Sequence, residues 1–356
     1  MGLHIKGSVL WGPKGPKALG GDCDFPPKPP LKRFLSFDGR ADGALRPLDR
    51  DDGRNEGVVW EREVGLVMVD GLKPYLKWAG GKRQLLPEIR RFVPREFDLY
   101  VEPFVGAGAV LFDLQPERAV INDANGQLVL TYEVIRDEVE GLIELLKEHA
   151  QRNSREYYYE VRELDRDPVE FGRLSKAEKA ARLIFLNKTC FNGLYRVNSQ
   201  GLFNVPYGRY KNPAICEEET LRGIHRYLNQ AEVTILNGDF EEAARLALSS
   251  GAKQPFVYFD PPYHSADNSN FTGYQASGFS ERDQVRLRDV MKELSENGVK
   301  CLLSNSDTEF IRKIYKDEAF RVETVTATRA INSDSAGRGK VNEVLVRSRN
   351  VRKRRA

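Results

Sequence analysis

A chain of 356 residues, of which 40% are hydrophobic and 30% charged, can bury a sizeable core in one large domain or two smaller ones. No apolar run is long enough to cross a bilayer, and the start of the chain, broken by Gly and Pro, lacks the pattern of a signal peptide. Four cysteines without a CxxC pair, beside four histidines, support neither a disulfide framework nor a metal site. We therefore expect a cytoplasmic protein with no membrane partner and no metal.

The net charge of +3 is too small to indicate a nucleic-acid partner on its own. The last ten residues, RSRNVRKRRA, hold six Arg or Lys and no acid, so the rest of the chain carries −3. A DNA-binding surface in the body must then be a local patch. The tail, assigned to residues 348–356, either attracts phosphates or is a solvated end, and its composition does not decide between the two.

Composition changes once along the chain. Residues 1–73 scatter Gly, Pro and charge, as in WGPKGPKALGGDCDFPPKPP, without a sustained apolar period. This segment predicts a disordered extension or a gene start placed too early, with Met68 as the natural beginning.

From Pro74 onward, strand patterns alternate with helical ones. We predict strands over 97–104, 118–123, 232–240, 255–260 and 300–307, and a terminal pair over 320–330 and 340–348. Between the fourth and fifth strands, Ser280 as N-cap, Asp283 three residues later and Gly298 as a stop predict a helix. The alternation indicates an α/β fold with a mostly parallel sheet and helices on both faces.

One long interval breaks the alternation. Residues 151–230 are helical first and then rich in Asn, Gly, Arg and Tyr, which predicts an inserted second domain. The first domain then consists of two parts, 74–150 and 231–347.

Four predicted strands end in an acid or an amide: Asp123, Asp239, Asp260 and Asn305. Ligands of an open α/β sheet bind beyond the carboxyl ends of its strands, so these groups can converge on one crevice. Any single one could be a helix cap. Four together favour a site.

The stretch YVEPFVGAGAVLFD places Gly106 and Gly108 between a predicted strand and a helix, where missing Cβ atoms allow a tight turn close to a ligand. A dinucleotide fingerprint needs a third Gly, but Leu111 stands there, which argues against a pyrophosphate-binding turn. A nucleoside-type cofactor remains, and Asp123 is suited to accept hydrogen bonds from ribose hydroxyls.

The stretch YFDPPYHS (258–265) ends a strand in an acid, two prolines and an aromatic ring. The exocyclic amine of a nucleobase is a poor nucleophile, because its lone pair is delocalised into the ring. Two fixed acceptors can hold its N–H bonds so that the lone pair turns outward. Proline donates no competing N–H and restricts the residue before it, so Asp260 and the Pro261 carbonyl are suited to this task, with Tyr263 stacking on the base.

In this order, FVGAG, the insertion and DPPY resemble the Dam-type adenine-N6 DNA methyltransferases, the alpha group of the DPPY family. LKWAGGKRQLLP (76–87) and FNGLYRVNSQGLFNVPYGRYKNP (191–213) are similar to that family's cofactor-binding N-terminus and target-recognition hairpin. The likeness runs from about Pro74 to Arg347. It implies a Rossmann-like S-adenosylmethionine-dependent methyltransferase fold with an inserted helical and hairpin target-recognition domain.

The resemblance also implies roles for individual residues. Lys82 would meet the methionine carboxylate of the cofactor, Trp78 would pack on it, and Asp239 would help to cradle its adenine unless it is a helix cap. The positions implied in binding S-adenosyl-L-methionine are Trp78, Lys82, Glu102, Phe104, Gly106, Gly108, Asp123, Asp239, Phe240 and Asp260. Those implied in the transfer are Asp260, Pro261, Pro262 and Tyr263.

By the same resemblance, the hairpin reads GATC in the major groove of double-stranded DNA. Arg196 would bond guanine O6 and N7 bidentately, and Lys77 would lie near the first guanine. Phe191 would wedge into the stack left by the adenine, which must flip because its N6 lies inside the duplex. The positions implied in binding DNA are Lys77, Phe191, Asn192, Leu194, Arg196, Pro206 and Tyr210.

The sequence therefore predicts an adenine-specific DNA methyltransferase that moves a methyl group from S-adenosyl-L-methionine to N6 within GATC, by base flipping and direct transfer. Cytosine-N4 methylation and a non-catalytic DNA-binding relative remain alternatives. Cytosine-C5 chemistry is disfavoured, because no cysteine follows a proline. We expect a monomer, associated with the nucleoid of a prokaryotic or phage-infected cell. Whether it pairs with a restriction endonuclease or serves housekeeping methylation is open.

Overall fold

The computed structural model of the chain describes residues 68–78, 80–265, 278–328 and 340–354. Residues 1–67 of the extension expected over 1–73 lie outside the described residues, as do the last two residues of the tail.

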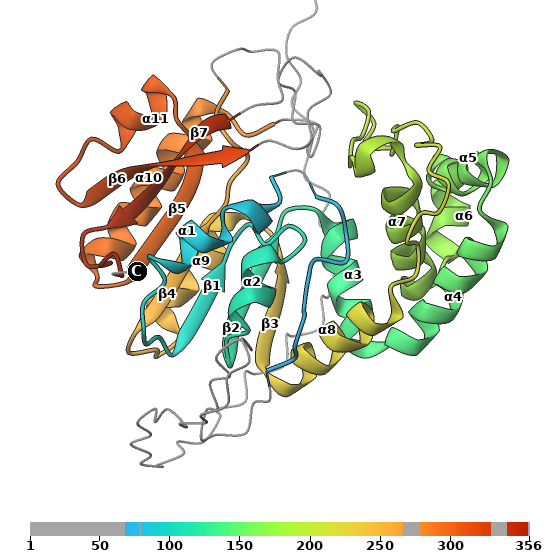
Figure 1. Ribbon diagram of the computed structural model, residues 1–356, viewed down its shortest axis with the longest axis horizontal. Helices are drawn as coiled ribbons and strands as arrows, with labels where there is room; N and C mark the ends of the chain where they lie inside the picture. Colours follow the sequence, from blue (N-terminus) through green and yellow to red (C-terminus); the bar gives the residue numbers. More distant parts are fainter. Residues whose placement is uncertain (1–67, 79, 266–277, 329–339, 355–356) are drawn as a thin grey trace, which may run out of the picture. The chain divides into compact units, whose positions relative to one another are not determined.

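In the part of the chain that the structure describes, seven strands form one sheet: β1 (Leu99–Glu102), β2 (Arg118–Asp123), β3 (Glu232–Asn237), β4 (Pro255–Phe259), β5 (Lys300–Ser306), β6 (Phe320–Thr328) and β7 (Lys340–Ser348). Their order is β3-β2-β1-β4-β5-β7-β6 (Figure 1). The first five in this order pair in parallel, whereas β7 is antiparallel to both of its neighbours. The predicted strands and the mostly parallel sheet are thus confirmed, with small differences at strand ends.

Apolar side chains cover both faces of this sheet. Along β4, Phe256 and Tyr258 join one hydrophobic cluster, Val257 and Phe259 join another, and all four are fully buried. Successive side chains of a strand point to opposite faces, so the two clusters are the two sides of the sheet. Burial on both faces explains why β4 is a continuous apolar run.

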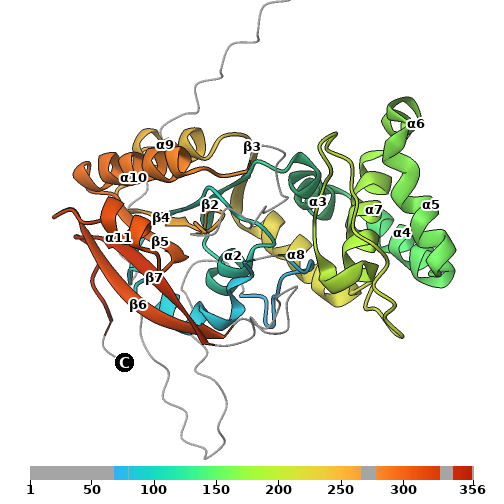
Figure 2. The same cartoon turned by 90° about the horizontal axis from the view of Figure 1, so that it is seen from above.

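Helices cover these faces on both sides (Figure 2). One side carries α9 (Phe240–Ser249), α10 (Glu281–Glu296) and α11 (Glu309–Ile314), and the other carries α1 (Leu86–Arg90), α2 (Ala109–Leu114) and α8 (Glu218–Gln230). The predicted start of α10 is confirmed, because the Ser280 and Asp283 side chains each accept a hydrogen bond from the other's backbone N–H, a capping box. None of the helices that the structure describes is long and apolar enough to cross a membrane.

A helical region adjoins the β3 edge of the sheet (Figure 1). It contains α3 (Gly126–Asp137), α4 (Val139–Arg152), α5 (Arg155–Glu163), α6 (Pro168–Arg173) and α7 (Lys176–Thr189). Its centre is α7, which is buried without interruption from Ala180 to Thr189. Tyr158 and Phe185 of this region share a hydrophobic cluster with Tyr100 of the sheet. Because this core is continuous, the inserted domain over 151–230 stays a prediction.

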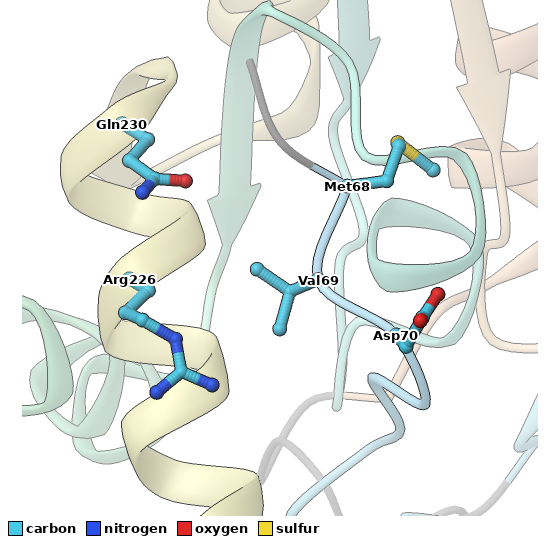
Figure 3. A pocket seen from close by; sticks show the side chains of 5 residues that line it. All are labelled: Met68, Val69, Asp70, Arg226 and Gln230. Carbon is cyan, nitrogen blue, oxygen red and sulfur yellow. The ribbon is translucent and has the colours of Figure 1, made fainter. Parts of the chain in front are cut away.

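Residues 68–73, which the sequence analysis assigns to the extension, pack on the folded body instead. The Val69 N–H donates to Gln115 Oε1 over 2.9 Å, and Gln115 Nε2 donates to the Val69 carbonyl over 3.0 Å. The segment crosses α8 at Gly223, where a Cβ would lie 2.9 Å from Leu72. Figure 3 shows Val69 facing α8 across a hollow also lined by Met68, Asp70, Arg226 and Gln230. The composition of residues 68–73 gave no basis for predicting these contacts.

The first part of the tail is also anchored. Val351 is buried, the Arg354 N–H donates to the Arg91 carbonyl over 2.7 Å, and the Arg354 guanidinium donates to the Pro94 carbonyl over 2.6 Å. Residues 349, 350 and 352–354 are nevertheless exposed, so both alternatives for the tail stay open.

Candidate active site

Three of the four polar groups predicted at strand ends lie at the carboxyl edge of the sheet. Asp123 is the last residue of β2, Asp260 directly follows β4, and Asn305 is the penultimate residue of β5. The fourth, Asp239, lies two residues beyond β3 and caps α9, where it accepts the Glu241 N–H over 2.9 Å. The helix-cap alternative for Asp239 is thus confirmed, and its contact with a cofactor stays a prediction.

The turn after β1 depends on two glycines. Gly106 and Gly108 have φ values of +51° and +77°, which favour glycine. A Cβ at Gly108 would lie 2.7 Å from the Phe112 ring and from the Tyr132 hydroxyl, and one at Gly106 would lie 3.0 Å from the Trp78 ring. The Gly106 N–H in turn lies 3.1 Å from Asp123 Oδ2. Three predicted cofactor contacts, Trp78, Gly106 and Asp123, are thus brought together.

Asp123 is a half-buried carboxylate at this turn. Besides the Gly106 N–H, it accepts the Asn125 N–H at Oδ1 over 2.9 Å. Burial raises the pKa of Asp123 to about 6, against the opposing effect of these two N–H groups. A carboxylate has about four acceptor sites, so lone pairs remain for hydroxyl donors of a ligand.

Phe104 and Phe240, both predicted to contact the cofactor, stack on each other with ring centroids 5.2 Å apart. Phe279 meets both rings at a steep angle, at 5.7 and 5.8 Å. The Arg286 guanidinium lies 4.4 Å from the Phe240 ring centroid and also pairs with Asp239. These groups form an aromatic wall between the turn after β1 and the start of α9.

Asp260 is held by two donors that act on the same oxygen. The Lys82 ammonium lies 2.7 Å from Asp260 Oδ1, and the Ser304 hydroxyl donates to Oδ1 over 2.9 Å. Burial raises the pKa of Asp260, and the charge of Lys82 opposes this rise. The buried ammonium of Lys82 thus contacts the proposed catalytic carboxylate. Its predicted contact with the methionine carboxylate of a cofactor stays a prediction.

Tyr263 is oriented through both its hydroxyl and its ring. The hydroxyl donates to Glu343 Oε2 over 2.9 Å, and the Lys82 ammonium lies 4.6 Å from the ring centroid. Glu102, another predicted cofactor contact, is buried in the sheet and accepts the Tyr100 hydroxyl over 2.9 Å. Burial raises the pKa of Glu102 well above the ordinary carboxyl value.

Lys77 lies against the predicted recognition hairpin. Asn187 of the buried α7 accepts the Lys77 N–H over 2.9 Å, and its amide donates to the carbonyls of Lys77 and Gly193, over 2.8 and 3.0 Å. A Cβ at Gly193 would overlap the Lys77 side chain. The Lys77 ammonium lies 4.4 Å from the ring centroid of Tyr210. Two predicted DNA contacts, Lys77 and Tyr210, thus lie against each other although they are far apart in the sequence.

The start of the hairpin presents an aromatic ring to solvent. The Phe191 side chain is 46% exposed, although its N–H is tied to the Pro206 carbonyl over 2.8 Å. Asn192 has a φ of +56°, so the chain turns sharply after Phe191. An exposed aromatic ring on a fixed backbone suits insertion between bases.

The tip of the hairpin carries Arg196. It is exposed, and its guanidinium donates to Asn204 Oδ1 over 2.8 Å across the hairpin. An isolated bridge between Val197 and Phe203 closes the same turn. Leu194, at the base of the hairpin, packs against the hydrophobic core. The predicted DNA contacts thus divide into exposed groups and an apolar support.

Sequence reasoning missed the side chains that hold the site in place. Ser304, Glu343 and Asn187 each bond a predicted site residue, as described above, and Gln284 of α10 bonds the Pro262 carbonyl over 2.9 Å. All four are buried. The only signal for them in the sequence is a polar residue at a position where the local pattern calls for an apolar one.

Taken together, the strand order, the antiparallel β7, the glycine turn after β1 and the acid that ends β2 define a Rossmann-like methyltransferase. The family follows from comparison with known sequences. A model of the D12 class N6 adenine-specific DNA methyltransferases matches residues 78–331, and the chain belongs to this family.

Curated relatives agree with this assignment. The chain is 47% identical to the Type II methyltransferase M1.LlaDCHI of Lactococcus lactis subsp. cremoris, in an alignment of 77% of this chain and 95% of the relative. It is 41% identical to the Type II methyltransferase M.MjaIII of Methanocaldococcus jannaschii, over 73% and 93% of the two chains. The DNA adenine methylase of Serratia marcescens is 36% identical, over 77% and 97%. The protein is therefore an N6 adenine DNA methyltransferase, and its substrate is DNA.

Proposed function

We propose that this methyltransferase takes its methyl group from S-adenosyl-L-methionine and transfers it to adenine N6 within GATC, after the adenine has flipped out of the duplex. The observation that carries the proposal is a pair of unoccupied acceptors at DPPY. Lys82 and Ser304 both act on Asp260 Oδ1. Within the described residues, no protein donor is hydrogen-bonded to Asp260 Oδ2 or to the Pro261 carbonyl.

The turn after β1 fits the proposed cofactor. Its two glycines leave the backbone without Cβ atoms beside Trp78, and Asp123 offers acceptors for two ribose hydroxyls. The aromatic wall formed by Phe104 and Phe240 supplies an apolar surface next to this turn. When bound, the cofactor supplies an electrophilic methyl group on a sulfonium centre.

The residues of DPPY would then act on the amine. Asp260 Oδ2 and the Pro261 carbonyl accept the two N–H bonds of N6, which turns the nitrogen lone pair away from the base plane. The Asp260 carboxylate stabilises the positive charge that develops on N6 during the transfer. Tyr263 stacks on the flipped base and keeps it in this orientation. Lys82 balances the charge of Asp260 and preserves its ionised form.

The hairpin would supply the sequence specificity. The exposed guanidinium of Arg196, which Asn204 orients from one side, has the fork geometry that matches guanine O6 and N7. Lys77 and Tyr210 lie against each other, and the exposed Phe191 ring would fill the gap that the adenine leaves. The assignment of GATC rests on the resemblance of Phe191 to Pro213 to the recognition hairpin of Dam-type enzymes.

Two relatives suggest a biological role. Those at 47% and 41% identity are named Type II methyltransferases, whereas the DNA adenine methylases are 32 to 36% identical. We infer that the protein acts as a monomer that protects DNA from a partner restriction endonuclease. Resistance of host DNA to a GATC-cleaving nuclease, lost on deletion of the gene, is the expected result.

The proposal is tested by product analysis. The full chain is incubated with S-adenosyl-L-methionine and a set of duplexes that carry GATC or each of its single base-pair substitutions, and the digested nucleosides are identified by mass spectrometry. We expect N6-methyladenine, on the GATC duplex above all others, and no product without the cofactor. N4-methylcytosine as the product, or equal methylation of every duplex, contradicts the proposal.

A further inference from the structure

Two buried amide side chains hold the backbone on both sides of Tyr263. Gln284 Nε2 donates to the Pro262 carbonyl over 2.9 Å, before Tyr263, and Asn305 Oδ1 accepts the His264 N–H over 3.0 Å, after it. The two amides are bonded to each other, since Asn305 Nδ2 donates to Gln284 Oε1 over 3.0 Å. Gln284 comes from α10 and Asn305 from β5, so both are fixed by the sheet and its helix.

The direction of these hydrogen bonds requires amides. Gln284 donates from Nε2 to the Pro262 carbonyl and accepts at Oε1 from Asn305. Asn305 donates from Nδ2 to Gln284 and accepts the His264 N–H at Oδ1. Asn305 Oδ1 also accepts the Ser306 N–H over 2.9 Å. Apart from the ring of neutral His, only the side chains of Asn and Gln carry a separate donor and acceptor on one neutral planar group. A carboxylate in either place would put an acceptor against an acceptor.

Stability alone does not explain a glutamine at this place. Both Gln284 and Asn305 are 0% exposed, and the same face of α10 otherwise buries Leu287, Val290 and Met291. Burial of a polar group is unfavourable unless all its partners are supplied, and an apolar side chain is the common choice on such a face. The amides are therefore retained for the geometry that they impose.

We propose that Gln284 and Asn305, as a two-amide bridge, are positioning residues that set Tyr263 and the Pro261 carbonyl in the orientation needed for methyl transfer. The inference rests on the proposed role of Asp260 to Tyr263. The bridge occupies the Pro262 carbonyl, so the carbonyl of Pro261 is the one left for the target amine. It also fixes the peptides that flank Tyr263, while the bond to Glu343 fixes the Tyr263 hydroxyl.

The test uses the nearly isosteric variant Gln284→Glu in the full chain. The change replaces the donor Nε2 by an oxygen that faces the Pro262 carbonyl, so the bridge opens beside DPPY. A displacement of about 1 Å in a reacting geometry can lower a rate by about a hundredfold. We expect the single-turnover rate of adenine methylation to fall by about tenfold or more, with dissociation constants for cofactor and duplex DNA changed by less than about threefold.

A matched control is available in Gln115→Glu. Gln115 is also buried and also uses its amide as donor and acceptor, but its partner is the Val69 backbone rather than the backbone of DPPY. This variant should lose stability for the same chemical reason and keep the methylation rate of the wild type. Thermal melting of both variants separates the effect on the rate from the effect on folding.

If Gln284→Glu does not fold, two further variants test the positioning role of the bridge. Gln284→Met keeps the length and burial of the side chain, so it should fold, yet it should be as slow as Gln284→Glu. Asn305→Asp keeps the acceptor for His264 but loses the donor to Gln284. Since the two amides act as one unit, the double variant Gln284→Met/Asn305→Asp should be no slower than the worse single variant.

The outcomes are distinct. If the wild type does not methylate adenine with S-adenosyl-L-methionine, the proposed function fails. If the wild type is active and a folded Gln284→Met or Gln284→Glu variant keeps its rate, the two-amide bridge has no positioning role. The same conclusion holds if the rate falls only in proportion to lost stability, as judged against Gln115→Glu, or if the effects of the two single variants simply add.

Discussion

The DPPY end of β4 and the recognition hairpin differ in how their side chains are held. Asp260, Tyr263 and the Pro262 carbonyl each bond to protein groups from other elements: Lys82, Ser304, Glu343 and Gln284. In the hairpin, Phe191 is exposed, and the guanidinium of Arg196 bonds to Asn204 of the same hairpin.

On the proposed mechanism, this difference means that the DPPY end is already ordered before DNA binds, whereas the hairpin completes its contacts on the DNA. Electrostatic catalysis depends on acceptors that are oriented in advance in an enclosed site, and the contacts around Asp260 supply that order. Base recognition needs exposed donors that can exchange solvent or local partners for base edges. Variants at DPPY should therefore change the rate on every duplex, and variants in the hairpin should change the choice among duplexes.

The largest effect is expected for Asp260→Ala. The change removes an acceptor for the target amine and leaves Lys82 buried without its carboxylate. The rate of methyl transfer should fall by about a hundredfold or more on all substrates. Single-turnover kinetics of the folded variant, with circular dichroism as a check on folding, provide the measurement, and turnover like that of the wild type would remove Asp260 from the mechanism.

A smaller, selective effect is expected for Arg196→Ala. Loss of a bidentate contact should weaken discrimination at one base pair by about 1–3 kcal/mol and leave the other positions of the site nearly as selective. Lys211→Ala, a change at another exposed cation within the hairpin stretch 191–213, is the control: it should weaken binding to every sequence alike and flatten the salt dependence. Equal slowing of Arg196→Ala on all substituted duplexes would argue against its proposed contact.

Cofactor affinity should depend on pH through Asp123. Burial raises the pKa of Asp123 from 3.8 to about 6, so below pH 6 the free protein carries a neutral carboxyl that must lose its proton to accept two hydroxyls. The dissociation constant for S-adenosyl-L-methionine should rise by about tenfold per pH unit below 6 and level off above it. By the same linkage, the contribution of this group to the free energy of unfolding is most favourable below about pH 4 and is lost as the pH rises through 6. Calorimetric titration checks the first expectation, and Asp123→Asn should bind weakly with a flat profile between pH 5 and 7.

The smallest effect is expected on removal of residues 1–67. The ordered contacts of the chain include Val69 and Leu72, so a protein that starts at Met68 keeps them. Melting temperature and methylation rate should both stay within error of the full chain. Truncation to Pro74 is the sharper comparison, because it also removes the bonds between Val69 and Gln115 and should lower the melting temperature. A large loss on the first truncation would show that the segment stabilises the fold.

The local sequence pattern was sufficient to predict the strands and to propose the residues of the candidate site. Alternation and turn residues located all seven strands, and the unusual stretch around Asp260 indicated a rigid pair of acceptors. Pairing order was not predictable in this way, since nothing in the residues of β7 says that it lies between β5 and β6. The partners of the site were hidden for the same reason: Ser304 and Gln284 reach DPPY from 44 and 22 residues away in the chain.

The order of the sheet has a consequence for biosynthesis. β7 follows the other described strands of the sheet in the sequence, yet it lies inside the sheet, between β5 and β6. Until β7 has been made, the edge of β5 from Leu302 to Ser306 lacks the strand that covers it in the folded protein. An unpaired strand edge is a template for pairing with another chain, so a ribosome that stalls before β7 would release an aggregation-prone product. By pairing with β5, β7 thus covers the strand edge that would otherwise be open to aggregation.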